Sequence, residues 1–352
     1  MSFGRLRASW TSAASKRQNT MLLENGRPTE KGKGYQFSAE MVAAVDVAIE
    51  LGRPLLVSGE PGCGKTELGY AVARQLGIQN LHLFTSKSSS EANELFYVYD
   101  ALKRFRDAQI TTLHKPGAPG VAPPAETDVG DYVEFQALGR AILDAHDRDA
   151  VAHLLRGRNG AIRPPGSPPR PSVVVIDEID KTPRDFPNDL LQEIEAMSFR
   201  VREFPADPKE PETPPGNEID RTMRPIVLIT SNEERQLPDA FLRRCVFFEI
   251  PFPDTWLLSR IVDRGLDARL SRMGLVPASH SLDPARRAAL IDLVLRFRET
   301  DPDKRPGVSE LLDAAAILSV HDTGDLTVTG PVLAKLKRDK DILAKLFTGE
   351  DG

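Results

Sequence analysis

Short apolar runs alternate with longer amphipathic segments over the first two thirds of the chain. Four of these runs, each of four or five residues, are rich in Leu, Val and Ile: 54–58, 81–84, 172–176 and 226–230. Uninterrupted apolar runs of this length are typical of parallel strands that are buried on both faces. Because the segments between them have a helical period, the pattern predicts an α/β domain with a central parallel sheet.

Start and stop signals for helices lie between the runs. Ser38 can cap one helix, which Gly52 ends, and Gly77 can end another that starts at Thr66. Further helices are predicted at 92–109, 135–155, 189–196 and 237–242. After Pro251 the strand signals thin out, and four more helices are predicted: 256–267, 284–299, 309–320 and 331–347. A small all-helical domain is therefore expected to follow the α/β domain.

These patterns divide the chain into three parts. Residues 1–33 are expected to form a flexible basic arm, 34–252 the α/β domain and 253–352 the helical domain. A transit peptide is the alternative for the first twenty residues, which are basic and lack acids, but no periodic apolar face supports it. Proline clusters predict loops or stiff linkers, rather than core, at three insertions: 114–132, 158–171 and 205–215.

Composition narrows the class of protein. A hydrophobic fraction of 40% and a charged fraction of 28% are those of an ordinary globular protein, and no apolar run reaches the length of a membrane span. The net charge of −5 gives no reason to expect general affinity for nucleic acid. Only Cys63 and Cys245 occur, far apart in sequence, so a cytoplasmic location is expected and a disulfide framework is not.

The most specific motif directly follows the first apolar run. Its eight residues have the pattern G-x-x-x-x-G-K-S/T: Gly59, Glu60, Pro61, Gly62, Cys63, Gly64, Lys65 and Thr66. Between a strand and a helix, such a loop directs backbone N–H groups toward nucleotide phosphates, where the helix N-terminus also favours negative charge. Lys65 is then expected on the β- and γ-phosphates and the Thr66 hydroxyl on Mg²⁺, with Glu67 completing the binding segment.

Acidic and amide side chains follow two later strands. Asp177 and Glu178 come after the run 172–176, and Asn232 comes after the run 226–230. The carboxyl ends of parallel strands meet at one edge of a sheet, where ligands bind. There Asp177 can hold the Mg²⁺ shell, Glu178 can take a proton from water, and Asn232 can orient that water. Solvated acids at a strand end, and an asparagine that only forms a turn, are the alternatives.

Three arginines are candidates for stabilising the charge that develops during phosphoryl transfer. Arg243 and Arg244 end the short helix at 237–242, and Arg305 precedes the helix at 309–320. One of the pair can act as an arginine finger in the site of a neighbouring subunit. Interaction with the helix dipole is the alternative for the pair, and a solvated surface position is the alternative for Arg305.

In their order along the chain, these motifs resemble those of an AAA+ ATPase. Three longer strings resemble the MoxR-like branch: VVIDEIDK at 174–181, DFPNDLL at 185–191 and LPDAFLRRC at 237–245. SELLD at 309–313, in the helical domain, is similar to that branch as well. The likeness spans residues 35 to 320, and its core motifs are highly specific.

The resemblance implies a P-loop NTPase fold with a helical lid, ATP and Mg²⁺ as cofactors, and a homo-oligomeric ring, with a hexamer favoured. It implies that Glu178 is the catalytic base, Asn232 the first sensor, Arg244 the trans-acting finger and Arg305 the second sensor. A protein with a von Willebrand factor A domain is the implied partner.

Smaller expectations concern the base and the two cysteines. ATP is favoured over GTP because the chain has no Asn/Thr-Lys-x-Asp motif, and Tyr35 or Phe37 is expected to border the adenine, as the linker does in similar proteins. Cys63 lies where a helix N-terminus can lower a thiol pKa, so a redox-sensitive thiol and a small residue that merely fits are both open. Cys245 is expected in the core.

Two classes of function are compatible with these motifs. The first is an oligomeric, chaperone-like ATPase that remodels, assembles or activates a partner protein. The second is a nucleotide-gated switch in which hydrolysis is slow and the bound state signals. A DNA-directed ATPase is a weaker third possibility, because neither the charge nor any motif indicates DNA binding.

Overall fold

The computed structural model describes residues 22–29, 31–113, 128–204, 219–277, 280–321 and 324–348. These residues form two compact units. The sheet unit contains Val42–Val57 and Gly69–Phe248, with the described part of Met1–Lys33. The helical unit contains Gly34–Met41 and Ser58–Leu68, with the described part of Glu249–Gly352.

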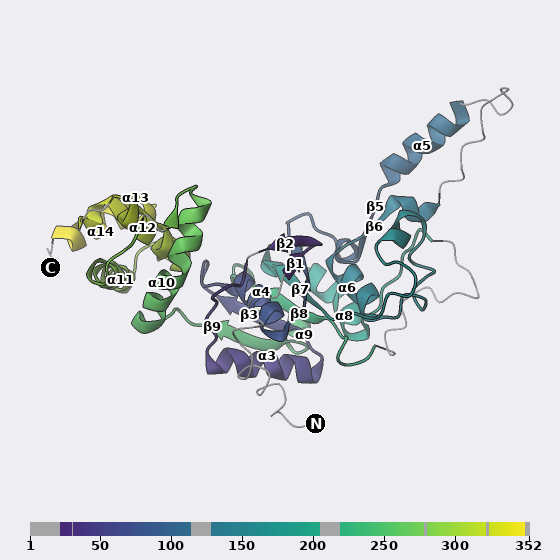
Figure 1. The fold of residues 1–352 in the computed structure, drawn as a ribbon, viewed down its shortest axis with the longest axis horizontal. Coiled ribbons are helices and arrows are strands. Elements are labelled where there is room, and N and C mark those ends of the chain that lie inside the picture. The colour runs from purple at the N-terminus through teal and green to yellow at the C-terminus, as the bar shows by residue number, and fades with distance from the viewer. Residues whose placement is uncertain are drawn as a thin grey trace. The chain divides into compact units, whose positions relative to one another are not determined.

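A seven-stranded sheet has the strand order β2-β1-β4-β7-β8-β3-β9 (Figure 1). The strands are β1 (Leu22–Glu24), β2 (Arg27–Thr29), β3 (Leu55–Gly59), β4 (Asn80–Thr85), β7 (Ser172–Asp177), β8 (Ile226–Thr230) and β9 (Val246–Ile250). Neighbours from β1 through β4, β7 and β8 to β3 run parallel, while β1 and β2 form an antiparallel hairpin. The central parallel sheet predicted from the four apolar runs is therefore confirmed.

Both faces of β7 are buried, as its uninterrupted apolar sequence requires. Val174 and Ile176 belong to the apolar cluster that also contains the buried face of α6 (Ala137–Ala145). On the opposite face, Val175 lies against α4 (Lys65–Leu76), where a Cβ on Gly69 would be only 2.4 Å from its Cγ2 atom. Helices thus cover both sides of the sheet and form a three-layered α/β arrangement.

Most helices predicted around these strands are confirmed. α3 (Ala39–Leu51) starts after Ser38, whose hydroxyl accepts a 3.1 Å hydrogen bond from the Met41 N–H, and it ends before Gly52. α4 ends before Gly77, whose φ of +72° suits a glycine after a helix. Three short helices of this region are α7 (Phe186–Asp189), α8 (Leu191–Ala196) and α9 (Asp239–Leu242).

Two long helix predictions are wrong in part: a second, two-stranded sheet interrupts the first and takes the first residue of the second, which also ends early. β5 (Tyr97–Tyr99) pairs antiparallel with β6 (Val133–Phe135). Only α5 (Ala101–Leu113) and a short 3₁₀ turn (Ala92–Leu95) remain of the helix predicted at 92–109, and α6 alone remains of the one at 135–155. Tyr97 and Phe135 are partners in this ladder, and both are buried. Pairing with a distant segment overrides the local helical preference.

Residues 22–29 do not form the flexible arm predicted over 1–33. They make the β1–β2 hairpin, whose Asn25-Gly26 turn has positive φ at both residues, the geometry favoured for two-residue hairpins. The hairpin is held to α4 by Arg74, which donates to the Thr29 and Lys31 carbonyls at 2.6 and 2.7 Å. Residues 1–21 lie outside the described residues.

The proline-rich insertion at 158–171 is a loop after its first 3₁₀ turn, as one of the two predicted alternatives has it, but Arg163 fixes it to the sheet unit. Arg163 is 1% exposed, and its guanidinium donates to four carbonyl oxygens: those of Leu143, His146, Ser167 and Pro168. Because these bonds join the insertion to the end of α6, the segment packs as part of the sheet unit. Residues 114–127 and the whole of 205–215 lie outside the described residues.

The helical unit is built mainly from α10 (Thr255–Arg272), α11 (Pro284–Glu299) and α12 (Val308–His321), followed by α13 (Gly330–Leu333) and α14 (Lys337–Thr348). Leu258, Leu290 and Leu311 belong to its single apolar cluster. The first three helices are as predicted, whereas the one expected at 331–347 is divided into α13 and α14. Among the helices of the described residues, none is long and apolar enough to cross a membrane.

The Gly69–Val175 contact gives a test of this packing. Gly69→Ala should lower the free energy of unfolding by about 1–2 kcal/mol despite the better helix propensity of Ala, because the new methyl group overlaps Val175. Val175→Ala alone should cost about 2 kcal/mol through a cavity. Urea unfolding of the double variant should show a cost well below the sum of the two, since the trimmed side chain makes room; additive costs would contradict the contact.

Candidate active site

The loop after β3 has a backbone that only glycine adopts readily. Gly59, Gly62 and Gly64 have φ values of +142°, +79° and +96°. A Cβ on Gly64 would lie 3.2 Å from a ring carbon of Tyr35, so a side chain there would also crowd the tyrosine ring. Turns of this kind present successive N–H groups to an anion at the start of the following helix.

Lys65 begins α4 and folds back over the loop. Its buried ammonium donates to the carbonyl oxygens of Gly59 at 2.6 Å and Glu60 at 3.0 Å. An ammonium has three protons to donate, so one remains beyond these two contacts. A phosphate oxygen in the loop can accept a hydrogen bond from the third proton or replace a carbonyl as acceptor, so Lys65 has donors available for a phosphate.

Cys63 is packed inside the loop rather than presented as a reactive thiol. It is buried, and its sulfur lies 3.0 Å from where a Cβ on Gly59 would be. Burial raises the pKa of Cys63, against the opposing effect of Lys65. Since the nucleophilic form is the thiolate, the structure favours a small residue that fits over a redox-sensitive one. Burial likewise raises the pKa of Cys245, to about 12.

Tyr35 covers the loop from the segment that precedes α3. Its ring packs edge-on against Phe37 with 5.3 Å between centroids, and it contacts the loop at Gly64. Burial raises the pKa of Tyr35, and nearby Cys63 and Glu67 add to the effect, so the phenol stays neutral. The adenine contact expected for Tyr35 or Phe37 stays a prediction.

In the sheet unit, Thr230 joins the ends of β7 and β8. Its hydroxyl donates to Asp177 Oδ1 at 2.7 Å and accepts from the Glu178 N–H at 2.9 Å. Glu178 has a φ of +57°, a left-handed conformation that costs a non-glycine residue about 1–2 kcal/mol. Its Oε1 atom accepts from Asn232 Nδ2 at 3.2 Å. The structure thus brings Asp177, Glu178 and Asn232 together, as their positions after neighbouring strands predict. Together with Asp180, these three residues are called the acidic cluster.

Asp180 and Lys181 hold this cluster and carry no predicted role. Asp180 is 2% exposed, and its Oδ2 atom accepts from the N–H groups of Asn232 and Glu234, both at 3.0 Å. Lys181 Nζ lies 2.6 Å from Glu178 Oε2, and this hydrogen bond raises the pKa of Lys181. Acids repeated at 177, 178 and 180, and Thr230 at the end of an apolar run, are the sequence signals that identify this supporting set.

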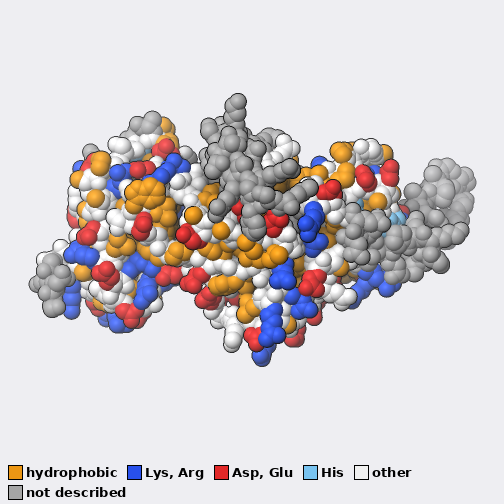
Figure 2. All heavy atoms as spheres, turned by 90° about the horizontal axis from the view of Figure 1, so that it is seen from below, with side chains coloured by type: hydrophobic (Ala, Val, Ile, Leu, Met, Phe, Trp, Pro, Cys, Tyr) orange, Lys and Arg blue, Asp and Glu red, His pale blue; other side chains and the backbone are white. Residues whose placement is uncertain are grey.

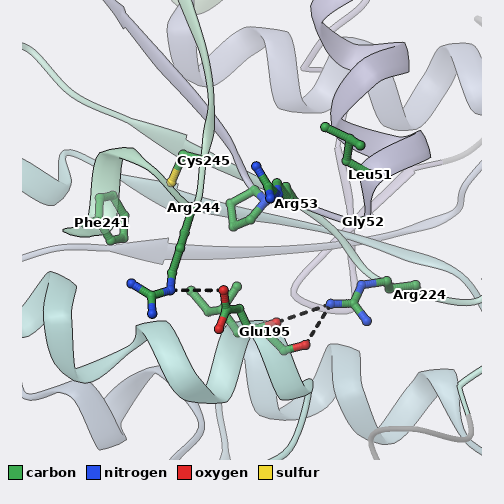
Figure 3. A pocket seen from close by; sticks show the side chains of 10 residues that line it. Leu51, Gly52, Arg53, Glu195, Arg224, Phe241, Arg244 and Cys245 are labelled. Atoms are coloured by element: carbon green, nitrogen blue, oxygen red, sulfur yellow. Dashed lines mark hydrogen bonds and ion pairs between the residues drawn. The ribbon is translucent and has the colours of Figure 1, made fainter. Parts of the chain in front are cut away.

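Arg244 lies in a different place, a pocket of about 220 Å³ shown in Figure 3. Its Nε atom is 3.0 Å from Glu195 Oε1 of α8, and its Nη1 atom donates to the Ala240 carbonyl at 3.2 Å. Arg224 shares the pocket and donates to the Glu195 carbonyl at 3.0 Å. Arg243, the other candidate finger, is exposed.

This pocket and the acidic cluster occupy opposite edges of the sheet. The pocket residues Pro54 and Arg224 precede β3 and β8, and the Val246 N–H, at the start of β9, donates to the Pro54 carbonyl at 2.8 Å. Asp177 and Thr230, by contrast, end their strands. A strand of five residues spans about 13 Å. The structure therefore does not bring Arg244 to the acids of its own sheet.

Arg305 lies on an exposed loop of the helical unit, and its side chain makes an ion pair within that loop. It pairs with Asp301 at 2.8 Å, and its side chain is 51% exposed. Arg298, on α11, contacts the phosphate loop within this unit: its Nη2 atom is 2.6 Å from Glu60 Oε2. No sequence motif marks Arg298, since it sits within a helix among other arginines.

Comparison with known families agrees with this arrangement of motifs. Residues 54–245 match the AAA domain of the dynein-related subfamily. The chain belongs to the AAA domain family. The matched segment begins just before β3 and ends just before β9, so it includes the phosphate loop, the acidic cluster and Arg244.

Two solved structures similar to this chain are single-residue variants of RuvB from Thermotoga maritima. The first is 15% identical with a TM-score of 0.35, and the match covers 81% of this chain and 70% of that one. The second is also 15% identical with a TM-score of 0.40, and the match covers 84% and 70%. No curated protein sequence matches significantly.

The donor atoms of this AAA domain suit a magnesium ion carried by a nucleotide. Among the described residues, no group of three or more His, Cys, Asp or Glu side chains could hold a metal ion. Mg²⁺ needs no such cage, because it commonly takes one or two protein oxygens and completes its shell with phosphates and water. The Thr66 hydroxyl and the Asp177 carboxylate are oxygen donors of that type.

The buried Asp180 carboxylate allows a stability test of the acidic cluster. Asp180→Ala should lower the free energy of unfolding by about 3 kcal/mol, because the N–H groups of Asn232 and Glu234 lose their acceptor. Asp180→Asn, which keeps one oxygen, should cost about 1 kcal/mol. Urea unfolding measures both, with Asp185→Ala, an exposed acid nearby, as the control expected within about 0.5 kcal/mol of wild type. Equal costs for the three variants would rule out the supporting role.

Proposed function

We propose that this chain is a Mg²⁺-dependent ATPase that acts as an oligomer and remodels, assembles or activates a partner protein, as MoxR-like chaperones do. Membership of the AAA domain family supports ATP-driven activity in general. The finer assignment is supported by the strings at 174–181, 185–191 and 237–245, which resemble the MoxR-like branch.

In the proposed reaction, the phosphate loop binds the nucleotide. The N–H groups around Gly62 and Gly64 surround the β-phosphate, and Lys65 donates to the β- and γ-phosphates. Thr66 and Asp177 supply oxygen ligands for Mg²⁺, which when bound neutralises charge on the phosphates. The hydroxyl of Thr230 supports this role of Asp177, since its 2.7 Å hydrogen bond fixes the carboxylate orientation.

Glu178 is the proposed general base, which takes a proton from the attacking water. Its left-handed backbone and its hydrogen bond to Asn232 support this role, because together they fix the carboxylate at the carboxyl edge of the sheet. Asn232 is in turn fixed by Asp180, so its amide is positioned to orient water. Such over-determined, strained positions cluster at functional sites.

The separation of Arg244 from the acidic cluster is the single observation that carries the oligomeric proposal. Arg244 lies at the amino edge of the sheet and Glu178 at the carboxyl edge, so one copy cannot supply both to one nucleotide. We infer that Arg244 leaves Glu195 and enters the site of a neighbouring copy, where it stabilises transition-state charge. A hexameric ring and a partner with a von Willebrand factor A domain are proposed from the resemblance alone.

A DNA-directed ATPase gains no support from the face shown in Figure 2 or from the net charge. On the face in Figure 2, Lys and Arg side chains of the described residues are interspersed with Asp and Glu. The chain as a whole carries a net charge of −5. Proteins that bind DNA through phosphates usually concentrate basic side chains on one face.

Glu178→Gln tests the hydrolytic mechanism. ATP binding, measured by calorimetry, should stay within about twofold of wild type, whereas phosphate release should fall at least about 100-fold because the general base is lost. Glu234→Gln, an exposed acid beside the cluster, is the matched control and should hydrolyse normally. Unchanged turnover in Glu178→Gln would exclude it as the base. A wild-type protein that binds ATP but barely hydrolyses it at any concentration would instead indicate the switch.

Arg244→Ala tests the shared site. The wild-type rate per subunit should rise with protein concentration as copies assemble, and Arg244→Ala should remove this rise, lowering the assembled rate by about 10³-fold. Light scattering should show that the variant still assembles with ATP. Arg243→Ala is the control and should behave as wild type; if Arg243→Ala loses the rise instead, Arg243 is the finger.

A further inference from the structure

One ion pair connects the phosphate loop with α11 inside the helical unit. Arg298 Nη2 lies 2.6 Å from Oε2 of Glu60, the second residue of the loop. The arginine side chain is 10% exposed and the glutamate side chain 39%. This contact is thus partly shielded from water. Two charges interact more strongly in such a position than at a fully exposed surface.

Arg298 is held in place by two further contacts. Its guanidinium carbon is 3.5 Å from the centroid of the Phe252 ring, and its Nη1 atom donates to the Pro306 carbonyl at 2.7 Å. A planar guanidinium that is stacked and hydrogen-bonded loses little further freedom when it pairs with a carboxylate. Arg298 is therefore pre-oriented toward Glu60.

Glu60 creates an electrostatic problem for a loop that binds phosphates. Its carboxylate repels the several negative charges of a nucleotide at short range. The single positive charge of Lys65 cannot offset both the Glu60 carboxylate and the phosphates. Its ammonium already donates to the carbonyls of Gly59 and Glu60, where phosphates are expected. A second acid near the loop, Glu310 of α12, has its own cation, Lys335, at 2.7 Å.

We propose that Arg298 is a positioning residue for nucleotide binding, which neutralises and orients Glu60 so that the loop accepts a polyphosphate. The inference rests on the proposed function and deepens it. Arg298 acts through Glu60 and not on the phosphates themselves. Because Phe252 and Pro306 belong to the helical unit, nucleotide affinity depends on this unit keeping the arginine in place.

Binding of a fluorescent ATP analogue with Mg²⁺ tests the inference. Arg298→Ala should weaken binding about tenfold or more, because Glu60 is left unneutralised. The double variant Arg298→Ala with Glu60→Gln should regain most of the affinity, since no carboxylate then needs a cation. Arg296→Ala, two residues earlier on α11 and paired with Asp292 at 3.2 Å, is the matched control and should bind as wild type.

Each outcome decides the matter. Wild-type affinity in Arg298→Ala, or a double variant as weak as the single one, would overturn the inference. If Arg298→Ala does not fold, as judged by circular dichroism, Arg298→Gln remains decisive, since it keeps a hydrogen-bond donor but not the charge: it should also weaken binding about tenfold, and wild-type affinity would contradict the neutralising role. Failure of the wild-type protein to bind ATP would refute the proposed function, which separates that failure from one confined to Arg298.

Discussion

The parallel hydrogen-bonded ladder of β7, β8 and β3 is the constraint on which the rest of the sheet unit depends. It pairs Ile176 with Ile229 and Val57 with Thr230, so these strands end at the same level. This alignment lets one hydroxyl, that of Thr230, contact both Asp177 and the backbone of Glu178. A slip of one residue would turn Thr230 to the other face and separate the carboxylates from the asparagine.

Local sequence signals predicted the elements that depend on local physics. The four apolar runs form strands. Ser38, Gly52 and Gly77 mark the ends of their helices, because helix caps and left-handed glycines act within a few residues. The β5–β6 pair was not predictable in this way, because its partners are more than thirty residues apart in sequence and Tyr97 suits a helix or a strand equally well by pattern. The Asn25-Gly26 pair, in contrast, is a local hairpin signal within the segment predicted to be an arm.

The positions of the acidic cluster follow from the sequence, whereas the positions of the arginines do not. Strand topology fixes where Asp177, Glu178 and Asn232 lie, so their proximity followed from the sequence once the strands were identified. No such rule fixes arginines, whose long side chains find carboxylates by tertiary packing. Arg305 pairs within its own loop while Arg298 reaches Glu60, a residue 238 positions earlier in the chain. Motif spacing cannot convey that distinction.

The opposite placement of Arg244 and Glu178 affects how many complete sites an assembly of a given number of subunits contains. If each complete site takes its acid from one copy and its arginine from the next, sites belong to interfaces rather than to chains. An open row of copies then has one site fewer than it has members, and closing the row into a ring adds a site without adding a subunit. The last contact to form completes a site in the same step, so ring closure itself increases the catalytic capacity of the assembly.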